Sequence, residues 1–289
     1  MKAVIAGGTG FLGSALAGSL RADGHQVTII SRRPHGPDQV AWTNRSALDG
    51  ADVVVNLAGT SLDSGRWNDS RKAEILHSRV QATETIVNAM SAASRRPPLL
   101  LNQSAVGFYG AHGSEPLTEE SPPGSDFLAS VCVAWEAAAM KAAWMTRVVL
   151  LRTGLPLDSS GGALPRLALP FRFFAGGRLG SGEQYWSWIH IDDWVRMIRW
   201  AIEEPDIKGP LNATAPAPAT NRELADALGR ALRRPVFAPA PAFVLRLVLG
   251  EMADALILSG QRVLPAKATR GGFEFRYADL DSALQHIYR

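Results

Sequence analysis

The chain opens with a glycine-rich turn between an apolar run and a segment of helical periodicity, and this feature limits the fold more than any other. Val4 and Ile5 lie in the apolar run, and glycines follow at positions 7, 10 and 13. Beyond them, apolar residues at positions 11, 12, 15, 16, 17 and 20 would share one face of a helix. A strand, a glycine turn and a helix in this order are typical of a unit that binds the pyrophosphate of a dinucleotide.

Each glycine of the turn has its own role in such a unit. Gly7 allows the tight turn, Gly10 lets the backbone approach the pyrophosphate, and Gly13 lets the helix pack close to the strand. The free amides and the positive dipole end of the helix favour the phosphates. The alternative is an ordinary glycine-rich turn. We predict that the dinucleotide contacts the turn and the first helical residues, namely Gly7, Thr9, Gly10, Phe11, Leu12 and Gly13.

The residues after the second expected strand, 26–30, distinguish between two dinucleotides. An NAD site has an acidic residue there, about 20 residues beyond the glycines, that binds the ribose 2′-hydroxyl. This chain has Ser31, Arg32 and Arg33 instead. A guanidinium group can bind a 2′-phosphate with two hydrogen bonds, whereas a carboxylate would repel it. The sequence therefore favours NADP(H), and the alternative is a pair of solvated surface arginines.

The remaining pattern predicts an α/β fold. Apolar segments at 52–59, 99–104 and 147–153 alternate with helical segments at 71–93 and 127–143, which is typical of a Rossmann-like, doubly wound parallel sheet. We assign residues 1–156 to this NADP-binding domain and expect 187–203 to return to it. Residues 157–289 would mainly form a smaller, mixed α/β C-terminal substrate lobe, in which 209–213 and 271–277 are predicted strands. The apolar segment 243–258 indicates either a buried helix pair or the wall of a groove or partner surface.

Composition excludes several classes of protein. The net charge is only +3 and no basic run exceeds two residues, so nucleic-acid binding is not expected. The single cysteine, Cys132, rules out an internal disulfide framework and fits a reducing compartment. The first apolar run is too short for a signal peptide, and no run of about 18 apolar residues would span a membrane. We expect a cytoplasmic protein with a small-molecule substrate, no metal and no membrane partner, and we also consider a homodimer.

Several short motifs follow the glycine turn in a fixed order: Asn56-Leu57-Ala58-Gly59, Tyr109-Gly110, Leu151-Arg152-Thr153-Gly154 and Trp188-Ile189-His190-Ile191-Asp192-Asp193. This series resembles the extended branch of the short-chain dehydrogenase/reductase superfamily, which contains sugar-nucleotide epimerases and dehydratases. Gly65-Arg66-Trp67, Ser78-Arg79, Trp135-Glu136, Gly161-Gly162 and Gly180-Ser181-Gly182 resemble an atypical subgroup, the epimerase-family proteins with an appended C-terminal lobe. The resemblance covers essentially the whole chain. It implies NADP, with cofactor contacts from Ser31, Arg32, Leu57, Ala58, Glu74, Arg79 and Leu155.

One departure from the superfamily concerns its chemistry. The superfamily uses a tyrosine and, four residues later, a lysine that lowers the tyrosine pKa from about 10 so that the phenol can relay a proton. The matching positions here hold Cys132 and Glu136. A thiol could in principle carry a proton, but a neighbouring carboxylate raises its pKa and cannot replace the charge of lysine. We interpret Cys132 as an inert, buried side chain.

Two residues near the end of strand 99–104 are the catalytic candidates. Ser104 lies one residue before the expected hydroxyl position, which Ala105 occupies when Tyr109 and Gly110 are the anchor. Ser104 could still hydrogen-bond a substrate carbonyl. Tyr109 is either a replacement acid/base or a packing residue.

Other polar residues have an ordinary structural explanation. His190 with Asp192 and Asp193 could support acid/base chemistry, but we expect one aspartate to cap the next helix and His190 to be a satisfied strand residue. Arg66 and Lys72 could bind an anionic substrate, although solvated charges are the default expectation.

The sequence thus predicts an NADP(H)-dependent oxidoreductase or epimerase that acts on a small polar substrate, with a nucleotide sugar as one option. The cofactor would carry the hydride, and the protein would orient the substrate and relay a proton. The alternative is a non-catalytic NADP(H)-binding sensor or scaffold, which the missing tyrosine–lysine pair favours.

Overall fold

A parallel sheet of seven strands organises the computed structural model, which describes residues 1–289. Its order is β11-β7-β5-β4-β1-β2-β3, and every neighbouring pair is parallel. This sheet confirms the predicted Rossmann-like α/β fold. The strands are β1 (Lys2–Ala6), β2 (Gln26–Ser31), β3 (Gln39–Ala41), β4 (Val53–Asn56), β5 (Leu99–Ala105), β7 (Arg147–Thr153) and β11 (Gly209–Ala213).

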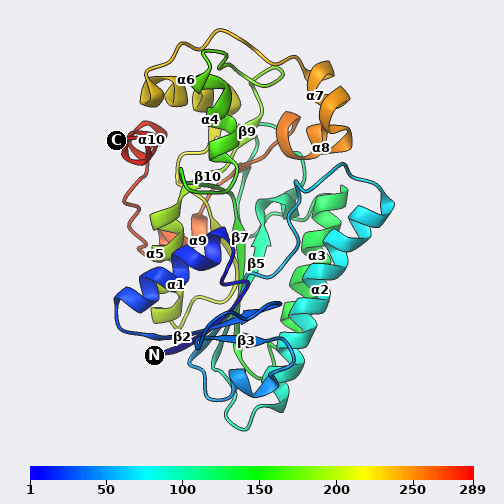
Figure 1. Cartoon of the computed structure of the whole chain (residues 1–289), viewed down its shortest axis with the longest axis vertical. Helices are drawn as coiled ribbons and strands as arrows, with labels where there is room; N and C mark the ends of the chain where they lie inside the picture. The colour runs from blue at the N-terminus through cyan, green and yellow to red at the C-terminus, as the bar shows by residue number, and fades with distance from the viewer.

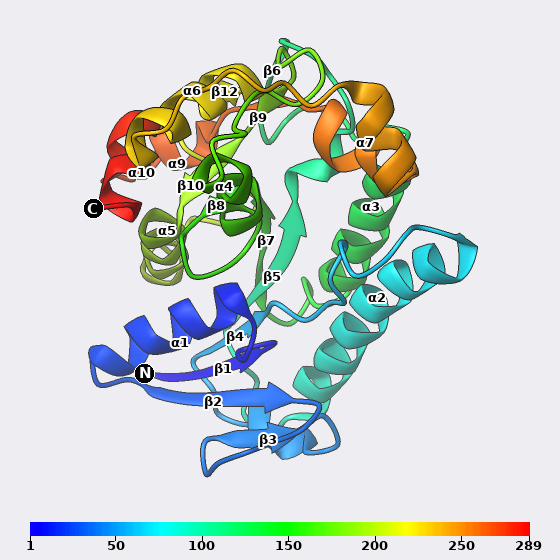
Figure 2. The same ribbon diagram turned by 45° about the horizontal axis from the view of Figure 1, so that its top comes forward.

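Helices cover both faces of the sheet. α1 (Phe11–Ala22) and α5 (Ile191–Glu203) lie on one face, and α2 (Asp69–Ala92) and α3 (Phe127–Met140) lie on the other (Figure 2). The alternation of strand side chains explains the two layers. In β1, Ala3 and Ile5 belong to the core cluster that contains Trp194 of α5, whereas Val4 belongs to the cluster that contains residues of α2 and α3. Both faces of each central strand are therefore apolar, as in other buried parallel sheets.

The smaller region packs around Trp188, which is fully buried. Three helices surround it: α4 (Leu164–Arg172), α6 (Asn221–Leu232) and α10 (Leu280–Ile287). Three short strand pairs lie outside the main sheet. They are β8 (Leu155–Leu157) with β10 (Trp188–His190), β9 (Tyr185–Trp186) with β12 (Ala219–Thr220), and β6 (Pro116–Leu117) with β13 (Arg262–Val263).

The remaining elements are short. They are α7 (Ala242–Leu249), α8 (Glu251–Ala253), α9 (Ala266–Arg270), the 3-10 helices η1 (Arg45–Leu48) and η2 (Val106–Tyr109), and the π-helix η3 (Asp254–Leu258).

Two local predictions for the C-terminal half were wrong. Residues 209–213 form β11, the edge strand of the main sheet beside β7, so they do not belong to the lobe. Residues 271–277 form no strand, because Phe273 is buried and the amides of Arg276 and Tyr277 donate to the carboxylate of Asp193 at 2.9 and 2.8 Å. Of the two alternatives for 243–258, the buried helix pair does not hold for α7, which has no buried residue, although Met252 and Ala253 of α8 are buried. The division into residues 1–156 and 157–289 stays a prediction.

Candidate functional site

The glycine turn after β1 leaves no room for side chains on its inner side. Gly7 has a φ of +77°, and a Cβ atom there would lie 2.8 Å from the carbonyl of Leu57. A Cβ atom on Gly13 would lie 2.4 Å from the carbonyl oxygen of Gly7. At Gly10, by contrast, the only neighbour is that same oxygen, at 3.4 Å. The turn is therefore closed toward β4 and open at Gly10, as an approaching pyrophosphate requires.

The first turn of α1 is free to bind an anion. Its N-cap residue is Gly10, no side chain caps the helix, and Thr9 is exposed. The leading amides of a helix have no acceptor within the helix, so they remain available to a phosphate. Leu12 packs against the core below them.

Phe11 makes a contact that sequence reasoning did not predict. Cβ atoms on Gly161 and Gly162 would lie 2.5 and 2.9 Å from the Phe11 ring, so the loop between β8 and α4 rests directly on the start of α1. The Gly161-Gly162 pair was the available signal, since two adjacent glycines often mark a close approach of backbone to another group.

The two arginines after β2 carry free positive charge at the same edge of the sheet. Arg32 and Arg33 are exposed, and neither forms an ion pair. The hydroxyl of Ser31 accepts a hydrogen bond from the Arg33 amide at 3.2 Å, which holds the backbone turn that presents both guanidinium groups. Such a pair of guanidinium groups is suited to a phosphate.

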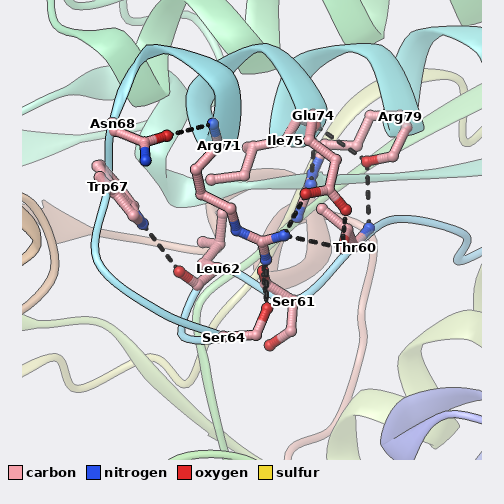
Figure 3. A network of polar contacts seen from close by, with 11 residues as sticks. Thr60, Ser61, Leu62, Ser64, Trp67, Asn68, Arg71, Glu74, Ile75 and Arg79 are labelled. Carbon is pink, nitrogen blue, oxygen red and sulfur yellow. Dashed lines mark hydrogen bonds and ion pairs between the residues drawn. The ribbon is translucent and has the colours of Figure 1, made fainter.

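Glu74 and Arg79 face the loop that follows β4 (Figure 3). Glu74 accepts hydrogen bonds from Arg71 at 2.6 Å and from Thr60 at 3.2 Å. The hydrogen bond from Arg71 is the main cause of the lowered pKa of Glu74, and the charge of Arg32 contributes less. The charge of Arg32 therefore acts on Glu74, although the two residues are far apart in the sequence.

Arg79 lies against the backbone of the same loop. Its guanidinium group donates to the Ile75 carbonyl at 3.0 Å and lies 5.2 Å from the centre of the Trp135 ring, and its burial lowers its pKa. A Cβ atom on Gly59 would lie 3.2 Å from Arg79 Cγ.

The predicted cofactor residues thus gather along the carboxyl ends of β1, β2 and β4. The turn contacts Leu57 and Ala58, Arg32 lies near Glu74, and Arg79 lies at Gly59. Leu155 is half-buried on β8, where its amide donates to the Ser187 carbonyl at 2.7 Å. Their contacts with a cofactor stay a prediction.

Ser104 belongs to a buried ion-pair network. Its hydroxyl donates to Glu136 Oε1 at 2.6 Å. Arg152 donates to the same carboxylate through Nε at 2.8 Å and through Nη2 at 2.9 Å. The side chains of Arg152 and Glu136 are only 3% and 8% exposed. The residue at the position of the superfamily's lysine is thus an acid whose charge a strand arginine neutralises.

Tyr109 belongs to the same network from the other side. Its hydroxyl donates to Asn212 Oδ1 at 2.7 Å and accepts from Arg152 Nη1 at 3.0 Å. The side chain is fully buried, and this burial raises the pKa of the phenol. Both catalytic candidates are hydrogen-bonded inside the protein, an arrangement that favours the packing interpretation of Tyr109. Their catalytic roles stay a prediction.

Cys132 lies beside this network as a neutral thiol. Its burial, and to a lesser extent the charge of Glu136, raise its pKa to about 12. Its sulfur atom lies 3.8 Å from the Ala105 carbonyl oxygen. At neutral pH the group is fully protonated, which fits an inert side chain.

The prediction for the Trp188–Asp193 motif was wrong in two respects. His190 itself caps α5, because its Nδ1 accepts the amide of Asp192 at 3.1 Å. The buried carboxylate of Asp193 instead holds the C-terminal segment through Arg276 and Tyr277. His190 is not fully satisfied, since its Nε2 is buried without a partner.

His190, Asp192 and His286 place their ligand atoms within 4.8 Å of one another. Because His190 Nδ1 accepts a hydrogen bond, the neutral ring carries its proton on Nε2 and offers no free lone pair to a cation. The group therefore does not have the chemistry of a metal site as it stands.

Arg66 and Lys72 are engaged by the C-terminal region. Arg66 donates to the Leu247 carbonyl at 2.6 Å, and Lys72 pairs with Glu251 at 2.6 Å. Neither is simply a solvated charge, and neither is free to bind an anion in this arrangement.

Comparison with known proteins extends along the whole chain. A model of the NAD dependent epimerase/dehydratase family matches residues 3–213, and a domain of unknown function, DUF1731, matches residues 240–287. The epimerase family protein SDR39U1 of Bos taurus is 39% identical over 293 residues, 99% of each chain. The chloroplastic SDR39U1 homolog of Arabidopsis thaliana is 40% identical over 304 residues, 99% of this chain and 86% of that protein.

Solved structures agree with these matches. The crystal structure of human epimerase family protein SDR39U1 (isoform 2) with NADPH has a TM-score of 0.95 at 37% identity and covers 100% of this chain and 99% of that one. UDP-N-acetylglucosamine 4-epimerase from Bacillus cereus, at 18% identity and a TM-score of 0.77 over 100% of this chain and 98% of that one, shares the fold alone. None of the helices here combines the length and apolar character needed to cross a bilayer.

Proposed function

The chain belongs to the NAD dependent epimerase/dehydratase family, and from this membership we propose that it is an NADP(H)-dependent oxidoreductase or epimerase acting on a small polar molecule. A nucleotide sugar is one such molecule. The observation that carries the proposal is the unpaired, exposed Arg32 and Arg33 at the end of β2, where an NAD site would have an acid.

The site fits a dinucleotide phosphate by its shape as well as by its charge. A Cβ atom at Gly7 or Gly13 would overlap backbone, whereas Gly10 is open and the start of α1 has no side-chain cap. In the proposal the turn and the α1 amides bind the pyrophosphate, and Arg32 and Arg33 bind the 2′-phosphate. NADP(H), when bound, supplies the hydride chemistry, and the protein supplies binding and orientation.

A second function has a specific observation in its favour. Glu136 occupies the lysine position of the superfamily and is paired with Arg152, and Tyr109 is fully buried. A protein with this network binds NADP(H) without the usual proton relay. A non-catalytic sensor or scaffold that responds to the redox state of its cofactor is therefore the alternative.

The first experiment is a titration of the protein with NADPH and with NADH, followed by tryptophan fluorescence. We expect NADPH to bind more tightly. Replacing both Arg32 and Arg33 with Ala should weaken NADPH binding more than tenfold and leave NADH binding nearly unchanged, because only NADPH carries the 2′-phosphate. Equal losses for both cofactors would contradict the assignment.

A second arginine pair provides a matched control. Arg233 and Arg234 are also adjacent and exposed, but they follow α6 in the lobe. The Arg233→Ala/Arg234→Ala variant should bind NADPH as the parent protein does. Once binding is measured, the absorbance of the reduced nicotinamide can be followed with carbonyl compounds and nucleotide sugars, which separates the enzyme from the sensor.

A further inference from the structure

Two segments of the C-terminal half contain arginines but no acidic residue. They are residues 164–182 and 229–250. The sequence between these segments and on either side of them contains both acidic and basic residues, so the lack of acidic residues is confined to the two segments. The arginines are Arg166, Arg172, Arg178, Arg230, Arg233, Arg234 and Arg246.

The two segments lie side by side. Gly176 pairs with Val236 and Leu179 pairs with Ala240 in parallel bridges. The amide of Phe237 donates to the Gly176 carbonyl at 3.1 Å. From there residues 233–241 run across the end of the lobe from α6 to α7 (Figure 1).

The same segments expose most of the large apolar side chains on the surface of the protein. Phe173 is 74% exposed, Phe237 is 68% exposed and Leu247 is 75% exposed. In α7 the apolar residues at 243, 244, 247 and 248 share one helix face, and that face is turned to solvent. A soluble surface seldom gathers so many projecting apolar groups without a partner.

Part of the arginine charge is not neutralised. Arg166, Arg230 and Arg246 form ion pairs with acids from other segments. Arg172 and Arg233 are exposed and form none. The Arg234 guanidinium lies 4.4 Å from the centre of the Phe174 ring, so positive charge and aromatic surface are directly adjacent. We call the exposed apolar and unpaired arginine side chains of these two segments the arginine–phenylalanine face: Phe173, Phe174, Phe237, Phe243, Leu247 and Val248 with Arg172, Arg233 and Arg234.

We propose that the arginine–phenylalanine face binds the surface of an anionic lipid bilayer. Its apolar side chains are each more than half exposed, so they project outward and can enter the boundary between headgroups and acyl chains. The exposed arginines belong to the same two segments, Arg234 lies against Phe174, and their charge matches the negative charge of the headgroups. We expected no membrane partner because the sequence has no apolar run long enough to span a membrane. A protein that lies on the surface of a bilayer needs no such run.

The proposal is independent of the cofactor and can be tested on the full-length protein. The measurement is co-sedimentation with vesicles of phosphatidylcholine alone and of phosphatidylcholine with phosphatidylglycerol. We expect binding to the anionic vesicles that weakens with added salt, and little binding to the neutral ones. An arginine near an anionic surface contributes about fivefold to binding. Arg172→Gln/Arg233→Gln should therefore weaken binding at least tenfold.

A second variant tests the apolar part. Phe173→Ser/Phe237→Ser/Leu247→Ser removes projecting groups and no buried contact, so the fold should survive, with NADPH affinity as the check. Trp144→Ser is the matched control, because Trp144 is 69% exposed but lies after α3, outside this face. Vesicle binding should fall with the triple variant and stay unchanged with the control.

Three outcomes would overturn the proposal. The first is no binding to anionic vesicles, and the second is equal binding by the parent protein and both face variants. The third is a dimer that binds no vesicles and that the triple variant converts to a monomer, since the face would then be covered by a second copy.

Discussion

Breaking the Arg152–Glu136 pair should destabilise the protein far more than breaking an ion pair on its surface. Arg152→Met removes two hydrogen bonds to Glu136, at 2.8 and 2.9 Å, and one to Tyr109, at 3.0 Å. It leaves the Glu136 carboxylate, whose side chain is only 8% exposed, without its countercharge. Loss of one partner of a buried pair costs about 3–5 kcal/mol in the free energy of unfolding.

The double variant distinguishes the contribution of the ion pair to stability from that of the hydroxyl groups bound to it. In Arg152→Met/Glu136→Met no buried charge remains, so the expected loss is smaller than with Arg152→Met alone. What persists is mainly the cost of the Ser104 hydroxyl, which loses its acceptor, about 1–3 kcal/mol for an unsatisfied group, since the Tyr109 hydroxyl still donates to Asn212. The two substitutions should therefore be coupled by at least about 2 kcal/mol.

Urea unfolding at neutral pH, followed by the fluorescence of the eight tryptophans, measures these differences. Lys141→Met is the control, because the Lys141–Glu84 pair is exposed at 61% and 40% and should contribute less than about 1 kcal/mol. Losses below about 1 kcal/mol for Arg152→Met, or a double variant whose loss equals the sum of the single ones, would refute this account of the network.

Three further perturbations follow from the geometry. Gly13→Ala places a Cβ atom 2.4 Å from the Gly7 carbonyl oxygen, so we expect at least tenfold weaker NADPH binding, whereas Gly18→Ala in the same helix meets nothing within 4 Å and should leave the affinity unchanged. Because burial raises the pKa of Cys132 to about 12, iodoacetamide should label the native protein at pH 8 far more slowly than the unfolded chain, and Cys132→Ala should keep the NADPH affinity. Fast labelling of the native thiol would contradict its burial. Burial lowers the pKa of His190 from 6.5, against the opposing charge of Asp192, so its contribution to stability is complete above about pH 6.5 and is lost as the pH falls through the lower folded value. His190→Asn keeps a cap for α5 and should flatten this dependence in urea titrations; an unchanged slope would assign the pH dependence to other groups.

Local patterns in the chain were enough to predict the first βαβ unit and the class of the fold. A strand, a glycine turn and an amphipathic helix are set by neighbours within about 20 residues, and their pattern is readable without long-range contacts. The Ser31–Arg33 segment could be recognised for the same reason, because it lies at a fixed distance from the glycine turn. Cys132 and Glu136 could likewise be recognised as the residues at the superfamily's tyrosine and lysine positions. The family resemblance rested on these local motifs, and the matches to known proteins confirm it.

Which distant groups meet depends on how the whole chain folds. Arg152 of β7 pairs with Glu136 of α3. β11 forms the edge strand of the main sheet beside β7, although about 55 residues of chain separate the two strands. The N-cap of α5 is His190 and not one of the two aspartates. The Asp193 carboxylate instead accepts hydrogen bonds from the amides of residues 276 and 277. The apolar pattern of α7 was compatible with a buried helix or with an open surface, because burial depends on whether another element covers the helix face, and Phe243, Leu247 and Val248 are exposed here. Periodicity specifies which face of an element is apolar, whereas only the packing of the whole chain specifies what that face meets.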